Sequence, residues 1–152
     1  MTRQSIFEYA GGEPAFLALA TAHNARCLAD PVLNHPFSHD GHPEHVRRLG
    51  QYWAEVFGGP PMFSQECGGH SAMLHLHASQ GAEDDLGERF VRCFVQAADD
   101  AGLPADPELR AALRAYMTWA VAEVLHYSPA GSHVPADLAM PHWTWNGLAG
   151  RA

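Results

Sequence analysis

The stretch Pro43–Phe57, PEHVRRLGQYWAEVF, carries the clearest helix signal in the sequence, and Gly58-Gly59-Pro60-Pro61 follows it directly. His45, Leu49 and Tyr52 recur at intervals of four and three residues, so they share one face of the predicted helix, with Arg48 beside them. The paired glycines and prolines predict a firm end to the helix. A histidine, an arginine and two largely apolar side chains therefore lie together on one helix surface.

Helical patterns on either side of this stretch predict an all-α protein with no internal repeat. We expect further helices over Ser5–Tyr9, from Pro14 to about Leu28, over His70–Ala78, over Glu83–Ala101 and from Pro107 to about Val124. The residues between Pro61 and Gly69 are expected to form a loop. No segment shows sustained alternation of apolar and polar residues bounded by hairpin turns, so no sheet is expected.

Composition excludes several classes of function. The chain has 152 residues and a formal charge of −8, which argues against a nucleic-acid binder and against binding to an anionic membrane. Its nine basic residues are all arginine, so lysine Schiff-base chemistry and a Walker-type phosphate loop are absent. Three cysteines without close spacing, no apolar leader and no apolar run of membrane length indicate a cytoplasmic protein without disulfides.

The chain changes character after Tyr127, where proline and glycine become frequent. This change divides it into a helical domain over residues 1–127 and a C-terminal tail over residues 128–152. The tail contains Met140, Trp143 and Trp145, whose apolar area is large enough to dock onto the helical body. We therefore expect this segment to pack on the domain rather than extend into solvent.

The 11 histidines suggest a metal or cofactor held between helices. One arrangement has His77 as the ligand of a haem iron, Arg48 as a cation for the propionates, and an apolar slot formed by Phe37, Leu49, Tyr52, Phe63, Phe90 and Met117. A second arrangement places zinc or copper on Cys67, His70 and His75, although this spacing matches no strong zinc signature. In a third, the histidines are ordinary polar surface residues. Spacing alone leaves all three open.

The sequence as a whole resembles the truncated haemoglobins, and group II of that family in particular. The resemblance runs from Ser5 to about Tyr127 and is carried by the order and spacing of several short blocks: SIFEYAGG at 5–12, ADPVL at 29–33, QYW at 51–53, FGGP at 57–60, Phe63-Ser64, Gly69-His70, His77-Ala78 and RFVRC at 89–93. It implies a two-over-two helical sandwich around haem b. It also favours His77 over His75 as the iron ligand, with Met73 and His70 as further haem contacts.

The resemblance also shows where this chain departs from the family pattern on the ligand side of the haem. Asn24, preceded by His23, stands where the family usually has a tyrosine, and Phe90 stands where group II usually has a tryptophan. His45 replaces a small residue, which makes it a candidate distal ligand of the iron. His45, Asn24 and His23 are therefore the candidate contacts for a bound gas, although His23 equally fits a buried core histidine.

These observations predict a haem globin that binds dioxygen, nitric oxide or carbon monoxide. One alternative is a haem-dependent peroxidase or nitric-oxide-converting enzyme in which His45 moves protons. Another is a haem-free metal-binding protein. The acidic charge suits a reductase with a basic surface as a partner. We expect a monomer or homodimer with no nucleic-acid or membrane partner.

Overall fold

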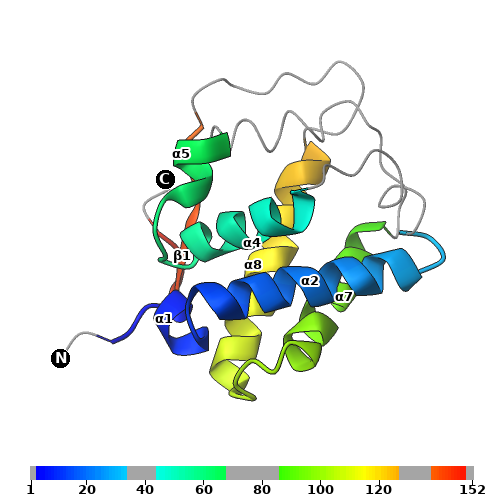
Figure 1. Ribbon diagram of the computed structural model, residues 1–152, viewed down its shortest axis with the longest axis horizontal. Helices are drawn as coiled ribbons and strands as arrows, with labels where there is room; N and C mark the ends of the chain where they lie inside the picture. The colour runs from blue at the N-terminus through cyan, green and yellow to red at the C-terminus, as the bar shows by residue number, and fades with distance from the viewer. Residues whose placement is uncertain (1–2, 34–43, 68–85, 127–137, 150–152) are drawn as a thin grey trace.

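Helix α2 (Glu13–Ala29) runs through the middle of the molecule and packs on both α4 (His45–Val56) and α7 (Leu86–Asp100), while α8 (Pro107–His126) packs on α7 (Figure 1). The short helix α1 (Ile6–Ala10) precedes α2. Another short helix, α5 (Met62–Cys67), follows α4. This computed structural model describes residues 3–33, 44–67, 86–126 and 138–149. The predicted helices in these ranges are confirmed, whereas the helix expected over His70–Ala78 lies outside them.

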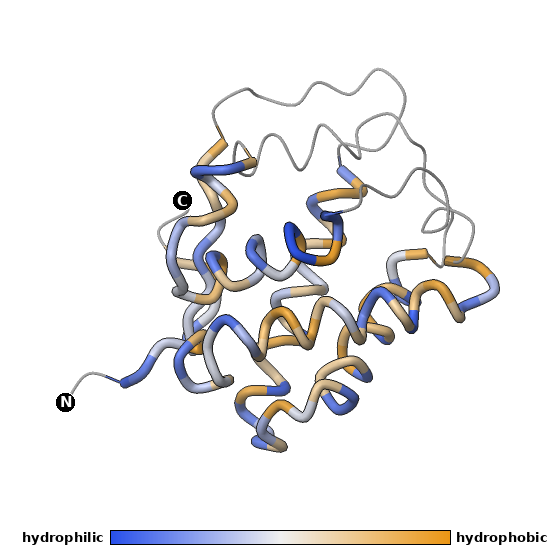
Figure 2. Tube along the Cα trace, in the orientation of Figure 1, coloured by the Kyte–Doolittle hydropathy of each residue, from blue (hydrophilic) through white to orange (hydrophobic). Residues whose placement is uncertain are grey.

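The apolar stripe predicted on α2 forms the centre of the core. Phe16, Leu19, Ala20, His23 and Cys27 are all fully buried, at the spacings of three and four residues that place them on one helix face. Figure 2 shows the hydrophobic middle of α2 beside the hydrophilic beginning of α4. The core therefore lies under α2, and α4 presents its polar beginning at the edge of that core.

Gly50 allows α2 and α4 to cross at short range. A Cβ atom at this position would lie 3.2 Å from the carbonyl oxygen of Phe16 and 3.3 Å from the Cα atom of Leu17. Both atoms belong to the backbone of α2, so they cannot give way as a side chain would. Glycine at this position lets the two helix backbones approach closely.

The end of α4 is held by the paired glycines. Gly58 has a φ of +105°, a conformation that favours glycine. A Cβ atom at Gly59 would lie 2.7 Å from both the Ala54 carbonyl oxygen and the ring of Phe7. The backbone N–H of Phe7 donates to the Phe57 carbonyl at 2.9 Å, so the same turn attaches α1 to the end of α4.

Residues Met62–Cys67 form helix α5, so the prediction of a loop between Pro61 and Gly69 was wrong for this segment. The carboxylate of Glu55, 3 % exposed, accepts a hydrogen bond of 2.9 Å from the backbone N–H of Ser64 and another from the Ser64 hydroxyl. A carboxylate from α4 thus satisfies a free donor at the start of α5. This cap comes from a different helix, which is why the local sequence did not reveal it.

A two-stranded antiparallel hairpin follows the helices and is an addition to the all-α prediction. Strands β1 (His142–Thr144) and β2 (Gly147–Ala149) pair with Thr144 opposite Gly147. Gly147 has a φ of +102°, a conformation that favours glycine, and it directly follows the turn residues Trp145 and Asn146. Each strand has three residues, too few to show the alternation that a sequence search needs.

The hairpin docks on the helical body, as expected for this part of the tail. Trp143 is 9 % exposed and belongs to the main hydrophobic core, and Met140, Trp145 and Leu148 pack against that core. The expected division of the chain after residue 127 falls outside the described ranges and remains a prediction. None of the described helices is both long and apolar enough to cross a membrane.

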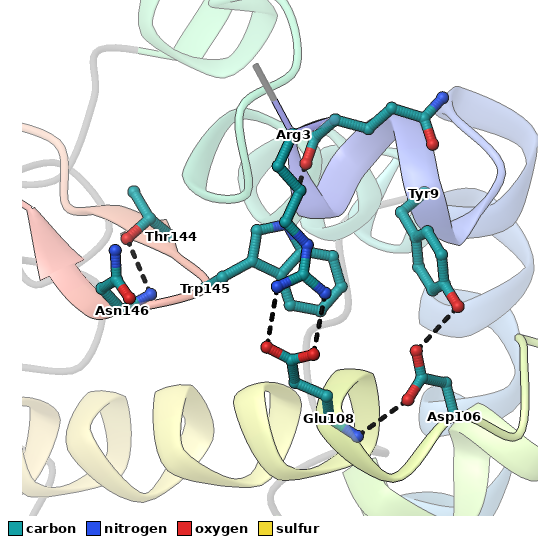
Figure 3. Close-up of polar contacts among 8 residues, drawn as sticks. Arg3, Tyr9, Asp106, Glu108, Thr144, Trp145 and Asn146 are labelled. Carbon is teal, nitrogen blue, oxygen red and sulfur yellow. Dashed lines mark hydrogen bonds and ion pairs between the residues drawn. The ribbon is translucent and has the colours of Figure 1, made fainter. Parts of the chain in front are cut away.

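A polar cluster that we call the clasp joins the hairpin to the first and last helices (Figure 3). The Arg3 guanidinium lies 3.7 Å from the centre of the Trp145 ring and donates two hydrogen bonds of 2.8 Å to the Glu108 carboxylate. The Trp145 indole N–H donates to the Gln4 carbonyl at 2.8 Å, and the Tyr9 hydroxyl donates to Asp106 at 2.7 Å. The clasp holds the start of the chain, α8 and the hairpin together.

Candidate functional site

The predicted face of α4 is present, with its members at different depths. His45 is the first residue of the helix and its side chain is exposed, Leu49 is half-buried, and Tyr52 is 4 % exposed. The Tyr52 ring meets the Phe63 ring edge-on, with 4.9 Å between ring centres. The face therefore runs from a solvent-accessible imidazole inward to buried rings.

The apolar residues expected to line a haem slot gather in one cluster where the structure describes them. Tyr52, Phe63 and Met117 belong to the main hydrophobic core, and Leu49 and Phe90 pack against it. These residues come from α4, α5, α7 and α8, so they converge from four helices. Phe37, His70, Met73, His75 and His77 lie outside the described residues.

Arg48, the predicted cation, has a buried side-chain nitrogen. Its Nε atom is shielded from solvent and has no hydrogen-bond partner within the described ranges. The neighbouring Arg47, by contrast, is exposed and pairs with Glu44 and Glu66. Because a buried donor without a partner is costly, Arg48 is suited to an acidic group that none of the described residues provides.

His23 lies in the core among aromatic rings. It is fully buried, and its ring centre lies 5.2 Å from that of Trp53, 4.4 Å from that of Phe90 and 5.9 Å from that of Phe94, all in edge-on orientations. This environment lowers the pKa of His23 to about 4, mainly by burial and slightly by the nearby His45, although a hydrogen bond to the Phe90 carbonyl opposes the shift. His23 is therefore neutral at pH 7.

One sulfur atom adjoins this histidine, and a second sulfur lies beyond it. The Cys27 Sγ atom lies 3.6 Å from His23 Nε2, and Cys93 packs against Cys27 in a second, smaller apolar cluster. Burial raises the pKa of both thiols. Both cysteines are free thiols in the structure, and thiols of this kind are unreactive at pH 7.

Asn24 lies next to His23 on α2 and is half-buried. Consecutive residues on a helix point about 100° apart, so Asn24 and His23 have different surroundings. The roles of Asn24, His23 and His45 toward a ligand remain predictions. For the rival metal arrangement, only Cys67, at the end of α5, is within the described ranges, where no group of three or more metal-binding side chains is found.

Sequence reasoning missed the aromatic residues that surround the candidate site. Trp53 and Tyr116 are both buried in the core, and Trp53 contacts His23 directly. Trp53 follows Tyr52 in the chain, so it lies on a different helix face from the predicted site. Its proximity to α2 depends on how α2 and α4 cross, and the only sequence signal for that crossing was Gly50.

The family of the chain follows from comparison with known proteins. The model of the bacterial-like globin family matches residues 5–124, and the chain belongs to that family. None of the curated proteins compared with the chain matches it.

Solved structures with a similar fold are haemoglobins. The hemoglobin of the thermophilic phototrophic bacterium Chloroflexus aurantiacus is 27 % identical in sequence to this chain, with a TM-score of 0.69. The aligned region covers 81 % of this chain and 98 % of the Chloroflexus chain. The thermostable hemoglobin of Thermobifida fusca is 27 % identical over 80 % of this chain and 97 % of its own, with a TM-score of 0.66. The group II truncated hemoglobin of Bacillus anthracis shares the fold at 22 % identity, with a TM-score of 0.71 over 88 % of this chain and all of its own. The expected truncated-globin fold is confirmed.

Membership of this family implies a haem-binding globin, and the described residues fit that cofactor. Haem needs an apolar slot for its ring and cations for its propionates. The cluster of Leu49, Tyr52, Phe63, Phe90 and Met117 provides apolar walls. Arg48 provides a cation whose buried Nε lacks a partner among the described residues.

Proposed function

We propose that this chain binds haem b through His77 and holds dioxygen, nitric oxide or carbon monoxide on the opposite side of the cofactor. The observation that carries this proposal is the buried Nε of Arg48, which has no hydrogen-bond partner among the described residues, on the same helix as the Tyr52 ring that packs against Phe63, in a chain of the globin family. When bound, haem supplies the iron that takes up the gas. The remaining chemistry belongs to the side chains around it.

Each of these side chains has a separate task in the proposed site. Arg48 holds a propionate and thereby orients the cofactor. Tyr52 and Phe63 exclude water because both are buried and pack edge-on. Asn24 and His45 offer hydrogen bonds to the bound gas in place of the tyrosine and tryptophan that are usual in group II relatives. We therefore expect faster dioxygen release than in a relative with both donors, by at least about tenfold for each lost hydrogen bond of roughly 1.5 kcal/mol.

Absorption spectra test the proposal. Protein reconstituted with haem should show a Soret band that shifts when carbon monoxide is added to the ferrous form. His77→Ala should abolish stable haem uptake, and His75→Ala is the matched control that should retain it. Haem loss in the His75 variant together with retention in the His77 variant would show that the ligand assignment is wrong.

His45 is also proposed as a ligand of ferric iron when no gas is present. Imidazole must be deprotonated to bind a metal, so the low-spin fraction of the ferric protein should fall as the pH drops through the histidine range. His45→Ala should remove this pH dependence. A ferric spectrum that is high-spin at every pH, with and without the substitution, would exclude His45 as a ligand.

A second candidate function is peroxidase or nitric-oxide conversion, and the exposure of His45 favours it. A general acid–base group must exchange protons with solvent, and His45 stands at the exposed start of α4. Peroxide turnover that falls in His45→Gln without loss of the Soret band would favour this enzyme over a gas carrier.

In either case we propose a cytoplasmic protein reduced by a partner with a basic surface. Metal binding by Cys67, His70 and His75 would instead give a protein without a Soret band.

A further inference from the structure

Tyr116 connects the candidate haem slot to the far side of the core. It lies on α8 and is 1 % exposed. Its hydroxyl group is hydrogen-bonded to the side chains of Tyr52 and Trp53. Tyr52 stands on the face of α4 that the proposed function assigns to haem. A single phenol therefore contacts two oxidisable side chains of α4, of which Tyr52 lies on the face assigned to haem.

Two tryptophans continue this connection outward. The Tyr116 ring centre lies 5.7 Å from that of Trp143 and 6.3 Å from that of Trp119, and the two indoles are 6.0 Å apart. Trp119 is half-buried on α8. Trp143 comes from β1, beyond residue 124 where the match to the globin family model ends. The hairpin thus adds an oxidisable ring to the core of the globin domain.

Tyrosine and tryptophan lose one electron more readily than the phenylalanines that surround them, because phenol and indole stabilise the resulting radical. We propose that Tyr52, Tyr116, Trp119 and Trp143 form a relay that carries oxidising equivalents from the haem to the surface of α8 when the protein meets a hydroperoxide. This relay rests on the haem binding proposed above, and it adds a protective or substrate-oxidising activity to gas binding.

The electrons and protons of this relay balance. Reduction of one hydrogen peroxide to two molecules of water would consume two electrons and two protons, and bound haem would supply the iron chemistry for that reduction. Trp119 and Trp143 each return one electron through Tyr116 and Tyr52, and each loses its indole proton. The two electrons and two protons that leave the indoles equal those consumed by the peroxide.

The hydrogen bond between Tyr52 and Tyr116 allows a proton to move together with each transferred electron. Once Tyr52 has been oxidised to its neutral phenoxyl radical, Tyr116 can pass it one electron together with one proton across the hydrogen bond between them, which restores Tyr52 and leaves the radical on Tyr116. Burial raises the pKa of Tyr116, so this phenol keeps its proton at rest. Tyr9, which is 37 % exposed and donates to Asp106, lies apart from this chain of contacts.

The test is the reaction of the ferric, haem-loaded full-length protein with hydrogen peroxide. Electron paramagnetic resonance of freeze-quenched samples should show tryptophanyl or tyrosyl radicals, and mass spectrometry should locate oxidised products on Trp119 and Trp143. Tyr116→Phe keeps the ring but removes the hydroxyl, and it should reduce both products severalfold. Tyr9→Phe is the matched control and should leave them unchanged. Haem-free protein should show neither product.

A second variant keeps the relay testable if Tyr116→Phe folds poorly. With both Trp119→Phe and Trp143→Phe, the outer end of the relay is removed, so a tyrosyl signal should replace the tryptophanyl signal. Tryptophan oxidation that is unchanged in Tyr116→Phe, or equally strong without haem, would overturn the relay. Peroxide that alters the Soret band without producing any protein radical would also overturn it while leaving haem binding intact. Failure to acquire a Soret band at all would overturn both proposals.

Discussion

Trp143 and Trp145 stand two residues apart in one hairpin, yet they stabilise the fold in different ways. Trp143 is 9 % exposed, and its ring packs on those of Tyr116 and Trp119. Among the described residues, the contacts of its side chain are with these rings rather than with polar groups. Trp145 is half-buried, stacks under Arg3 and donates its indole N–H to Gln4. The contrast separates burial of apolar area, which is insensitive to salt, from exposed charge contacts, which water and ions weaken.

The largest expected effect is on the buried side of this contrast. Trp143→Ala removes a core ring and leaves a cavity beside Tyr116, so the free energy of unfolding should fall by about 3–5 kcal/mol. Denaturant unfolding monitored by circular dichroism measures this change. Trp143→Phe should restore most of the loss because it refills much of the volume. An alanine variant as stable as wild type would mean that the hairpin does not cover the core in solution.

An intermediate effect comes from placing a charge among the buried rings. The folded protein resists protonation of His23, whose pKa is about 4 against an ordinary value of 6.5. The unfolded chain therefore binds the extra proton first as the pH falls, and stability decreases between about pH 6.5 and 4, by about 3 kcal/mol in total. Above pH 6.5 this contribution is constant.

Unfolding midpoints measured from pH 7.5 to 4.5 for wild type and His23→Phe check this prediction. The variant should lose the decrease, whereas His126→Gln, at the exposed end of α8, should keep it. The clasp carboxylates complicate only the more acidic range. Hydrogen bonds from Tyr9 and Arg3 lower the pKa values of Asp106 and Glu108, so their stabilising contribution is lost below the ordinary carboxyl range. If stability falls with pH to the same extent in wild type and in His23→Phe, the pKa of His23 is not lowered in the folded protein.

The smallest effect is expected in the clasp. Trp145→Ala should destabilise the protein clearly less than Trp143→Ala, and Arg3→Gln should have a smaller effect still, because Arg3 and Glu108 are about half exposed. High salt should diminish the effect of Arg3→Gln but leave that of Trp143→Ala unchanged. Thermal unfolding at low and high ionic strength measures both responses. An Arg3 effect that persists at high salt would show that packing of its side chain on Trp145, rather than charge, holds the clasp.

The sequence predicted those parts of the fold that depend on local pattern. The stripe of α2 and the shared face of Leu49 and Tyr52 repeat at helical spacing, so their burial could be inferred from that spacing alone. The assignment of Arg48 to a cofactor likewise used only its charge and its position on the helix, and it remains a prediction. The resemblance to truncated haemoglobins supplied the arrangement of the helices, which local pattern does not contain.

What the sequence could not supply depends on contacts between distant segments. The cap of α5 comes from Glu55 on another helix, and the three-residue strands of the hairpin are too short to show a period. His23 fitted either a ligand contact or a core residue, because its surroundings are supplied by Trp53 and Phe90 from other helices. Burial of that histidine is now established, whereas its contact with a ligand remains a prediction, as does the role of His77.

The close contact at Gly50 fixes the position of α4 relative to α2. The backbones of α2 and α4 nearly touch there, so that part of α4 has little freedom to slide or rotate. His45 lies five residues earlier, about 7.5 Å along the helix axis, at the beginning of α4. A larger side chain at position 50 would push α4 away from α2 and so displace Leu49 and Tyr52 together with His45. The distance between the core and the α4 face that carries His45, Leu49 and Tyr52 therefore depends on the absence of a side chain at Gly50.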